Sequence, residues 1–143
     1  MNDSAKSLLD EFPLFFEWEI TNECNSKCVH CYNNSGRKLS DELNNSELDK
    51  VVEELCKRKP IKVDFIGGEP LLHPGLFKIA RKLKKHGISL GVITNGSLLS
   101  DSKIKEMKEL FSMIQISLDG NKTSNSKIRG ENFQNKIEKE GLN

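Results

Sequence analysis

Residues 61–70 read IKVDFIGGEP, a short apolar run that ends at two glycines, a glutamate and a proline. An apolar run of this length between turn residues predicts a buried strand over Ile61–Ile66. Gly67 and Gly68 permit backbone angles and close approaches that other residues avoid. Gly67–Pro70 therefore fits two interpretations, a tight turn from strand to helix or a loop whose backbone meets a ligand.

The same sequence of strand, polar turn and helix recurs along the chain. Further strands are predicted at 15–20, 88–94 and 113–118, and helices at 46–58, 76–86 and 100–111. Residues 121–132 are polar and predict a loop, followed by a short helix at 132–140. Such alternation is typical of α/β proteins with a parallel sheet, wound either as a doubly wound sheet or as a barrel.

Composition limits the class of protein. The chain has 143 residues, the size of one domain, with 36% hydrophobic and 30% charged residues, which excludes a mainly disordered chain. A net charge of +1 gives no reason to expect binding to nucleic acid or to an anionic membrane. Residues 1–11 are polar and acidic, unlike a signal peptide, and no apolar stretch is long enough to span a membrane. We therefore expect a cytoplasmic protein.

Each notable polar motif follows the end of a predicted strand. In parallel α/β folds this edge of the sheet is where ligands bind. The motifs are therefore expected to lie close together around one site. They are Cys24–Cys31, Gly67–Pro70, Thr94–Gly96 and Ser117–Gly120.

The first motif holds three cysteines, Cys24, Cys28 and Cys31, with the spacing C-x3-C-x2-C. Structural zinc sites and electron-transfer iron–sulfur clusters take four protein ligands, so three thiolates favour a cluster with one open iron. His30 would complete a zinc site in the alternative interpretation. Cys56 lies among the apolar residues of a predicted helix, where a cysteine is usually a small core residue.

The loop Cys24-Asn-Ser-Lys-Cys28-Val-His-Cys31-Tyr32 resembles the signature of the radical S-adenosylmethionine superfamily, and Gly67-Gly68-Glu69-Pro70 is identical to that family's usual motif. The resemblance implies a 4Fe-4S cluster on the three cysteines, with S-adenosylmethionine bound to the fourth iron. It also implies reductive cleavage of that cofactor to a 5′-deoxyadenosyl radical. His30 stands where the family usually has an aromatic residue near adenine.

The resemblance also assigns roles to other residues. The branches that mature peptides or build cofactors share the Ser117-Leu-Asp-Gly and Ile128-Arg-Gly forms, which implies a peptide or small cofactor precursor as substrate. An electron donor of the flavodoxin or ferredoxin type would reduce the cluster. Asn95 fits a plain Asn-Gly turn as well as a ribose contact, and Arg129 fits an ordinary surface position as well as a carboxylate contact. The implied cofactor contacts are Gly67, Gly68 and Glu69 for the methionine amino group, Asn95 and Ser117 for the ribose or its surroundings, and Arg129 for the methionine carboxylate.

The sequence departs from the family in length. The family core has about six βα units, whereas four are predicted here as a partial barrel that forms one domain over residues 1–143. No cysteine follows Cys56, so no auxiliary-cluster domain is expected. The fourth strand would be an exposed edge, which invites pairing with a partner chain or a second copy. A cluster-binding module without turnover, or a fragment of a longer enzyme, is the alternative.

Overall fold

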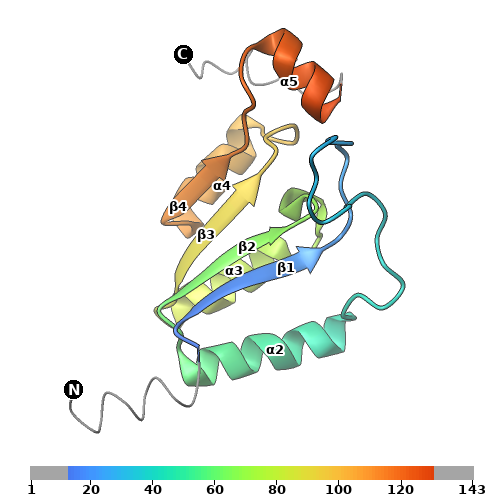
Figure 1. Ribbon diagram of the computed structural model, residues 1–143. Coiled ribbons are helices and arrows are strands. Elements are labelled where there is room, and N and C mark those ends of the chain that lie inside the picture. Colours follow the sequence, from blue (N-terminus) through green and yellow to red (C-terminus); the bar gives the residue numbers. More distant parts are fainter. Residues whose placement is uncertain (1–12, 131–143) are drawn as a thin grey trace, which may run out of the picture.

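The structure, a computed structural model, describes residues 13–130, in which strands and helices alternate (Figure 1). A 3-10 turn, η1, directly follows the Gly-Gly-Glu segment. The elements are β1 (Phe15–Thr21), α2 (Asn45–Arg58), β2 (Lys62–Gly67), η1 (Pro70–Leu72), α3 (Leu76–Lys85), β3 (Ser89–Thr94), α4 (Asp101–Leu110), β4 (Met113–Ile116) and α5 (Lys122–Arg129).

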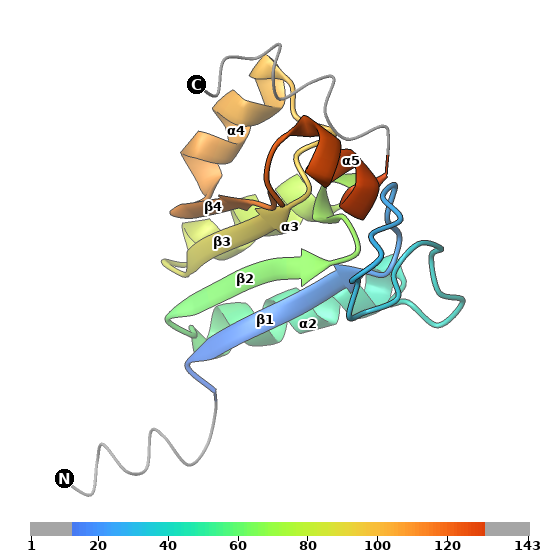
Figure 2. The ribbon, with the colours of Figure 1, turned by 45° about the horizontal axis from the view of Figure 1, so that its top comes forward.

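The four strands form one sheet in the order β1-β2-β3-β4, and every neighbouring pair is parallel. Each connection steps one strand further in the same direction. Since such crossovers are right-handed, this winding places the crossover helices on one face. Figure 2 shows α2 beside β1, α3 behind β3 and α4 beside β4. The predicted α/β fold with parallel strands is confirmed, and the winding is that of a partial barrel.

The core lies between the sheet and these helices. Val63 and Phe65 of β2 are completely buried, and the Phe65 ring packs against Trp18 and Phe111 with centroid distances of 5.7 and 6.1 Å. Cys56 of α2 is 8% exposed within this core, as its position in the sequence predicted. Burial of apolar side chains on one face leaves the alternate residues of each strand on the other.

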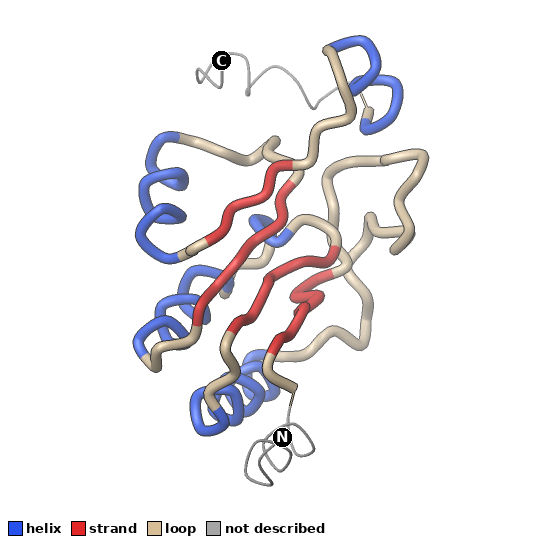
Figure 3. The backbone as a smooth tube through the Cα atoms, turned by 60° about the vertical axis from the view of Figure 1, so that its left-hand side comes forward, coloured by secondary structure: helices blue, strands red, loops and turns tan. Residues whose placement is uncertain are grey.

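The opposite face of the sheet is polar in part. Glu17, Asp64, Gly91 and Met113 are register partners in one row across the strands. Figure 3 shows the helices that run beside the strands gathered on one side of the sheet, and the longest loops beyond one end of it. This second face is therefore open where it meets the carboxyl ends of the strands.

The C-terminal part differs from the prediction. Residues 121–132 were expected to be a loop, but Lys122–Arg129 form α5, which begins at Asn121, whose side chain accepts a hydrogen bond from the Ser124 amide (3.1 Å). The fourth strand ends at Ile116 rather than at 118. The chain turns there because the Asp119 amide donates to the side chain of Asn125, which is fully buried (2.9 Å). The helix predicted at 132–140 lies outside the described residues.

No helix within residues 13–130 combines the length and the apolar character that a membrane crossing requires.

Candidate functional site

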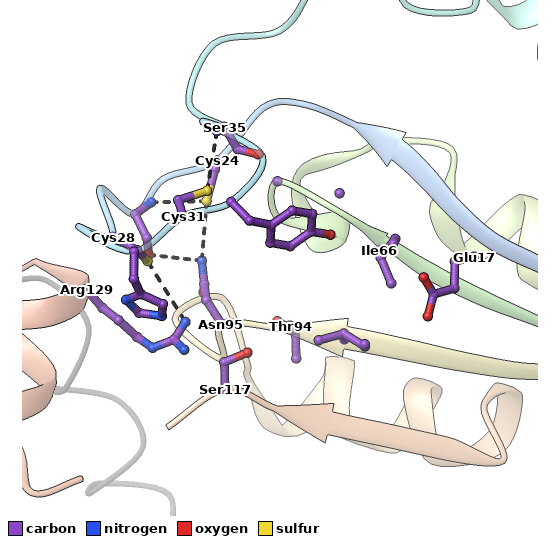
Figure 4. Close-up of a pocket in the computed structure, with 16 residues that line it drawn as sticks. Glu17, Cys24, Cys28, Cys31, Ser35, Ile66, Thr94, Asn95, Ser117 and Arg129 are labelled. Carbon is purple, nitrogen blue, oxygen red and sulfur yellow. Dashed lines mark hydrogen bonds between the residues drawn. The ribbon is translucent and has the colours of Figure 1, made fainter. Parts of the chain in front are cut away.

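A pocket of about 270 Å³ lies at the carboxyl ends of the strands (Figure 4). The loop after β1, the end of β2, the turn after β3 and the residue after β4 all contribute to its wall, and so does α5. It brings together every site residue predicted from the sequence except Glu69. Those lining residues are Cys24, Cys28, His30, Cys31, Gly67, Gly68, Asn95, Ser117 and Arg129.

Backbone hydrogen bonds close the cysteine loop on itself. The Cys24 amide donates to the Gly36 carbonyl (3.1 Å), and the Gly36 amide donates to the Asn22 carbonyl (3.0 Å). Glu23 and Gly36 form an isolated parallel bridge. These bonds therefore hold the two ends of the segment that carries the thiols, residues 22–24 and Gly36, against each other.

Glu42 also holds the ends of the cysteine loop in place, a role that was not identified from the sequence. Its carboxylate accepts hydrogen bonds from the amides of Asn22 (2.8 Å) and Leu39 (3.2 Å) and from the Thr21 hydroxyl (3.1 Å). Burial of Glu42 acts to raise its pKa, but these donors outweigh it and the pKa is lowered. A single glutamate between β1 and α2 forms no motif, so the sequence alone does not reveal this role.

The three thiols occupy different environments. Burial raises the pKa of Cys24, although the Ser26 amide donates to its Sγ (3.4 Å). Burial also raises the pKa of Cys28, against the opposing effect of the Arg129 guanidinium. Burial acts in the same direction on the exposed Cys31, but backbone donors, of which Ser35 is the strongest, outweigh it and lower the pKa. Cys31 is therefore the thiol most ready to form a thiolate.

The donor set fits an iron–sulfur cluster with an open iron. Three thiols face one pocket, and Cys56 lies apart from it in the core. Within residues 13–130 no three His, Cys, Asp or Glu side chains surround one point closely enough to hold a single metal ion.

The two glycines of the second motif lie against the base of the cysteine loop. The Gly68 amide donates to the Thr21 carbonyl (2.8 Å), and the Glu69 amide donates to the Glu23 carbonyl (2.8 Å). A Cβ on Gly68 would come within 2.2 Å of the Glu23 carbonyl oxygen, and Gly67 has a φ of 125°. The motif thus holds the cysteine loop in place through its backbone, in addition to lining the pocket.

Glu69 is buried behind the pocket and does not line it. Its carboxylate accepts hydrogen bonds from the amides of Leu71 (3.0 Å) and Asn95 (2.7 Å) and from the Thr94 hydroxyl (2.8 Å). The side chain therefore ties the ends of β2 and β3 together. Burial raises the pKa of Glu69, and its hydrogen-bond donors only partly offset that effect.

The Glu69 carboxyl predicts a pH-dependent contribution to stability. Because its pKa is raised on folding, the stabilisation is present below the ordinary value of 4.5 and is lost as pH rises through the folded pKa. The free energy of unfolding should therefore fall relative to that of Glu69→Gln as pH rises from 4.5, with a slope of at most about 1.4 kcal/mol per pH unit. Urea denaturation of both proteins across this range measures the difference. Parallel curves would show that Glu69 does not titrate abnormally.

Asn95 serves as a turn residue and also contacts the cysteine loop. Its side-chain carbonyl accepts a hydrogen bond from the Ser97 amide (2.9 Å). Its side-chain amide donates to Asn25 Oδ1 (2.9 Å) and to Ser26 Oγ (3.1 Å), and lies 3.9 Å from the Sγ of Cys24. Asn95 therefore forms the predicted turn and also lines the pocket, and its contact with the ribose stays a prediction.

Helix α5 brings Arg129 to the cysteine loop. The Arg129 side chain is only 12% exposed, pairs with the Asp119 carboxylate and lies with Nη1 4.0 Å from the Sγ of Cys28. His30 Nε2 lies 3.6 Å from the same carboxylate, and the Val29 amide donates to the Ile128 carbonyl (2.9 Å). Arg129 is therefore a partly buried pocket residue rather than an ordinary surface arginine.

Comparison with known proteins gives a family. The family model described as the Radical SAM superfamily matches residues 18–139. Fe-coproporphyrin III synthase of Methanosarcina barkeri is 33% identical over 115 residues, which cover 79% of this chain and 29% of the relative. Mycofactocin maturase MftC of Mycobacterium tuberculosis is 28% identical over 138 residues, which cover 91% of this chain and 35% of the relative. The chain thus spans about a third of the length of these relatives.

Solved structures share the fold. The crystal structure of Streptococcus suis SuiB bound to precursor peptide SuiA matches 90% of this chain and 31% of its own, with a TM-score of 0.72 at 16% identity. Native anSMEcpe with bound AdoMet matches 87% of this chain and 38% of its own, with a TM-score of 0.71 at 24% identity. The four-stranded parallel sheet is therefore the arrangement found in these proteins.

Proposed function

Because this chain belongs to the radical S-adenosylmethionine superfamily, we propose that Cys24, Cys28 and Cys31 hold a 4Fe-4S cluster at which S-adenosylmethionine is cleaved reductively. The superfamily uses this cluster and this cofactor. When bound, the reduced cluster supplies one electron to the sulfonium, which breaks a C–S bond to give methionine and a 5′-deoxyadenosyl radical. Residues 1–143 would supply the part of the radical enzyme core that holds both groups.

One observation carries the proposal: the three thiols share a pocket with the ends of β2, β3 and β4. This is the edge of a parallel α/β sheet at which ligands bind. The pocket also offers groups of complementary chemistry to a methionine moiety. Backbone groups at Gly67 and Gly68 would meet its amino group, and the partly buried Arg129 would meet its carboxylate.

The other residues predicted to contact the cofactor are His30, Asn95, Ser117 and Glu69. His30, Asn95 and Ser117 line the pocket and would approach the adenosyl part of the cofactor. Glu69, which does not line it, would act by positioning the ends of β2 and β3 rather than by touching the methionine amino group. This role differs from the contact that the resemblance alone implied.

Anaerobic reconstitution with iron and sulfide tests the proposal. We expect about four irons and four sulfides per chain. Release of 5′-deoxyadenosine from added S-adenosylmethionine is expected under reductant. Tight zinc binding without cluster formation would contradict it. A cluster that forms but releases no 5′-deoxyadenosine would instead support a cluster-binding module without turnover.

The second candidate function is a module that binds the cluster without turnover of its own. The chain spans 29% of Fe-coproporphyrin III synthase and 35% of mycofactocin maturase MftC. The described sheet has β1 and β4 at its edges. An exposed edge strand can pair with another chain, so we propose that β4 is where a partner or a second copy would add to the sheet. Measuring 5′-deoxyadenosine release against protein concentration tests whether association is needed for turnover.

The substrate is proposed to be a peptide or a cofactor precursor. Relatives of both kinds match this chain, among them a mycofactocin maturase and a coproporphyrin synthase, and one similar structure holds a precursor peptide. A flavodoxin or ferredoxin would supply the electron, and the protein would work in the cytoplasm. Reduction of the reconstituted cluster by a purified flavodoxin, followed spectroscopically, tests the choice of donor.

A further inference from the structure

The proposed cofactor pocket extends beyond the residues assigned to the cluster and to S-adenosylmethionine. Its wall also includes Glu17, Ile66 and Ile93, from the open face of the sheet. Figure 4 shows Glu17 and Ile66 at the end of the pocket away from Arg129 and Cys28. The described pocket thus has a cationic side chain near the cluster loop and an acidic one at its far end.

Glu17 is the carboxylate that lines this pocket among the residues described. Within residues 13–130 its side chain has no hydrogen-bond or ion-pair partner. Asp64, its register partner on β2, is paired with Lys62 at 2.8 Å. The nearby cation is therefore already engaged, and the negative charge of Glu17 remains available to a ligand.

The same carboxylate lies where two hollows meet. Glu17, Tyr32 and Ile66 line the cofactor pocket and also a second hollow, whose other lining residues come from β1, α2 and β2 and include Glu19. A ligand that lies along β1 would pass Glu17 before it reached the cysteine loop. The carboxylate is thus at the entrance from the second hollow into the first.

Resting on the function proposed above, we propose that Glu17 binds an ammonium or guanidinium group of the substrate and so sets its position beside the cofactor. A carboxylate without a partner, next to apolar Ile66 and Ile93, complements a side chain that has an aliphatic stem and a cationic head. Lysine, arginine and simple alkyl amines have this form. The aliphatic stem would lie over the two isoleucines.

Binding of short peptides to the full chain, reconstituted with cluster and S-adenosylmethionine, tests this assignment. The probes are acetyl-Gly-Lys-Gly-amide and its neutral counterpart acetyl-Gly-Gln-Gly-amide, measured by calorimetry at low ionic strength. We expect Glu17→Gln to weaken binding of the lysine peptide by about three- to fivefold, the upper part of the range for an exposed ion pair. Binding of the glutamine peptide should not change.

Glu19→Gln is the matched control, because Glu19 lies on the same strand and lines only the second hollow. It should leave binding of the lysine peptide within about twofold of wild type, a difference of about 0.4 kcal/mol. The affinity for S-adenosylmethionine and the rate of 5′-deoxyadenosine release without peptide are measured alongside in wild type and in Glu17→Gln. These two measurements report on the proposed function separately, because peptide binding can be measured even where cleavage fails.

Several results would overturn the assignment of Glu17. Equal affinity of wild type for the lysine and glutamine peptides, or no binding of either, would show that the carboxylate recognises no cation. Equal weakening by Glu17→Gln and Glu19→Gln would indicate a general effect of surface charge. A loss of S-adenosylmethionine affinity in Glu17→Gln that matches the loss for the peptide would make Glu17 a cofactor contact.

Discussion

Replacing Cys28 with alanine is expected to abolish assembly of the cluster. Cys28 lies in the middle of the loop, with its Sγ 4.0 Å from Nη1 of Arg129 and its thiol in the shared pocket. Two thiolates cannot replace three ligands to three irons, and no further cysteine lines the pocket within the described residues. Iron and sulfide contents after anaerobic reconstitution, together with the visible absorption of the cluster, measure the result.

Cys56→Ala is the control for this prediction. Cys56 lies on the buried side of α2, within the core. Replacing it with alanine should lower the free energy of unfolding by about 1–2 kcal/mol and leave the cluster intact. A normal cluster in Cys28→Ala would refute the ligand assignment. Loss of the cluster in Cys56→Ala at unchanged folding would do the same, because it would make Cys56 a ligand.

Replacing Gly68 with alanine is expected to have the largest effect on folding among substitutions at the site. The added Cβ would lie 2.2 Å from the carbonyl oxygen of Glu23 and 2.7 Å from that of Asn22, both in the backbone. Backbone cannot move aside as a flexible side chain can, so the loop base must separate from β2. We expect a loss of about 3 kcal/mol or more in the free energy of unfolding, measured by urea denaturation.

Gly36→Ala is the matched control, because no atom lies within 4 Å of a Cβ built at Gly36. Its stability should stay within about 0.5–1 kcal/mol of wild type. If Gly68→Ala proved as stable as Gly36→Ala and still bound the cluster, the close packing of the glycine motif against the cysteine loop would be wrong.

The sheet and the composition of the pocket were predictable from sequence because both depend on local patterns. The apolar run Ile61–Ile66 and the glycines after it place a strand and its end within one or two residues of β2. Parallel strands then bring their ends to one edge, so four separate motifs converge without any knowledge of distances. For this reason the predicted pocket residues that follow the strands, from Cys24 to Ser117, lie together.

Helix α5 was missed because its sequence, KTSNSKIR, has weak helix propensity. Its position depends on long-range contacts, including the bond from the Val29 amide to the Ile128 carbonyl and the burial of Asn125. Such contacts leave no periodic pattern in the sequence. The polar character of these residues predicted a loop, whereas tertiary contacts determine the helix.

Glu69 illustrates a second limit. The resemblance to the family implied that its side chain contacts the methionine amino group, and that contact stays a prediction. The structure buries the side chain among donors from Leu71, Thr94 and Asn95. Position at the correct edge of the sheet is predictable from strand periodicity, but the direction of a side chain beyond the strand end is not.

The hydrogen bonds that close the cysteine loop have a consequence for how iron is acquired. Asn22, Gly36 and Glu42 hold the two ends of the loop together within the protein itself. Much of the entropy of loop closure is therefore lost during folding, before any metal arrives. Metal that binds the three thiols would therefore meet a loop whose ends are already in place, so that less entropy remains to be lost on binding.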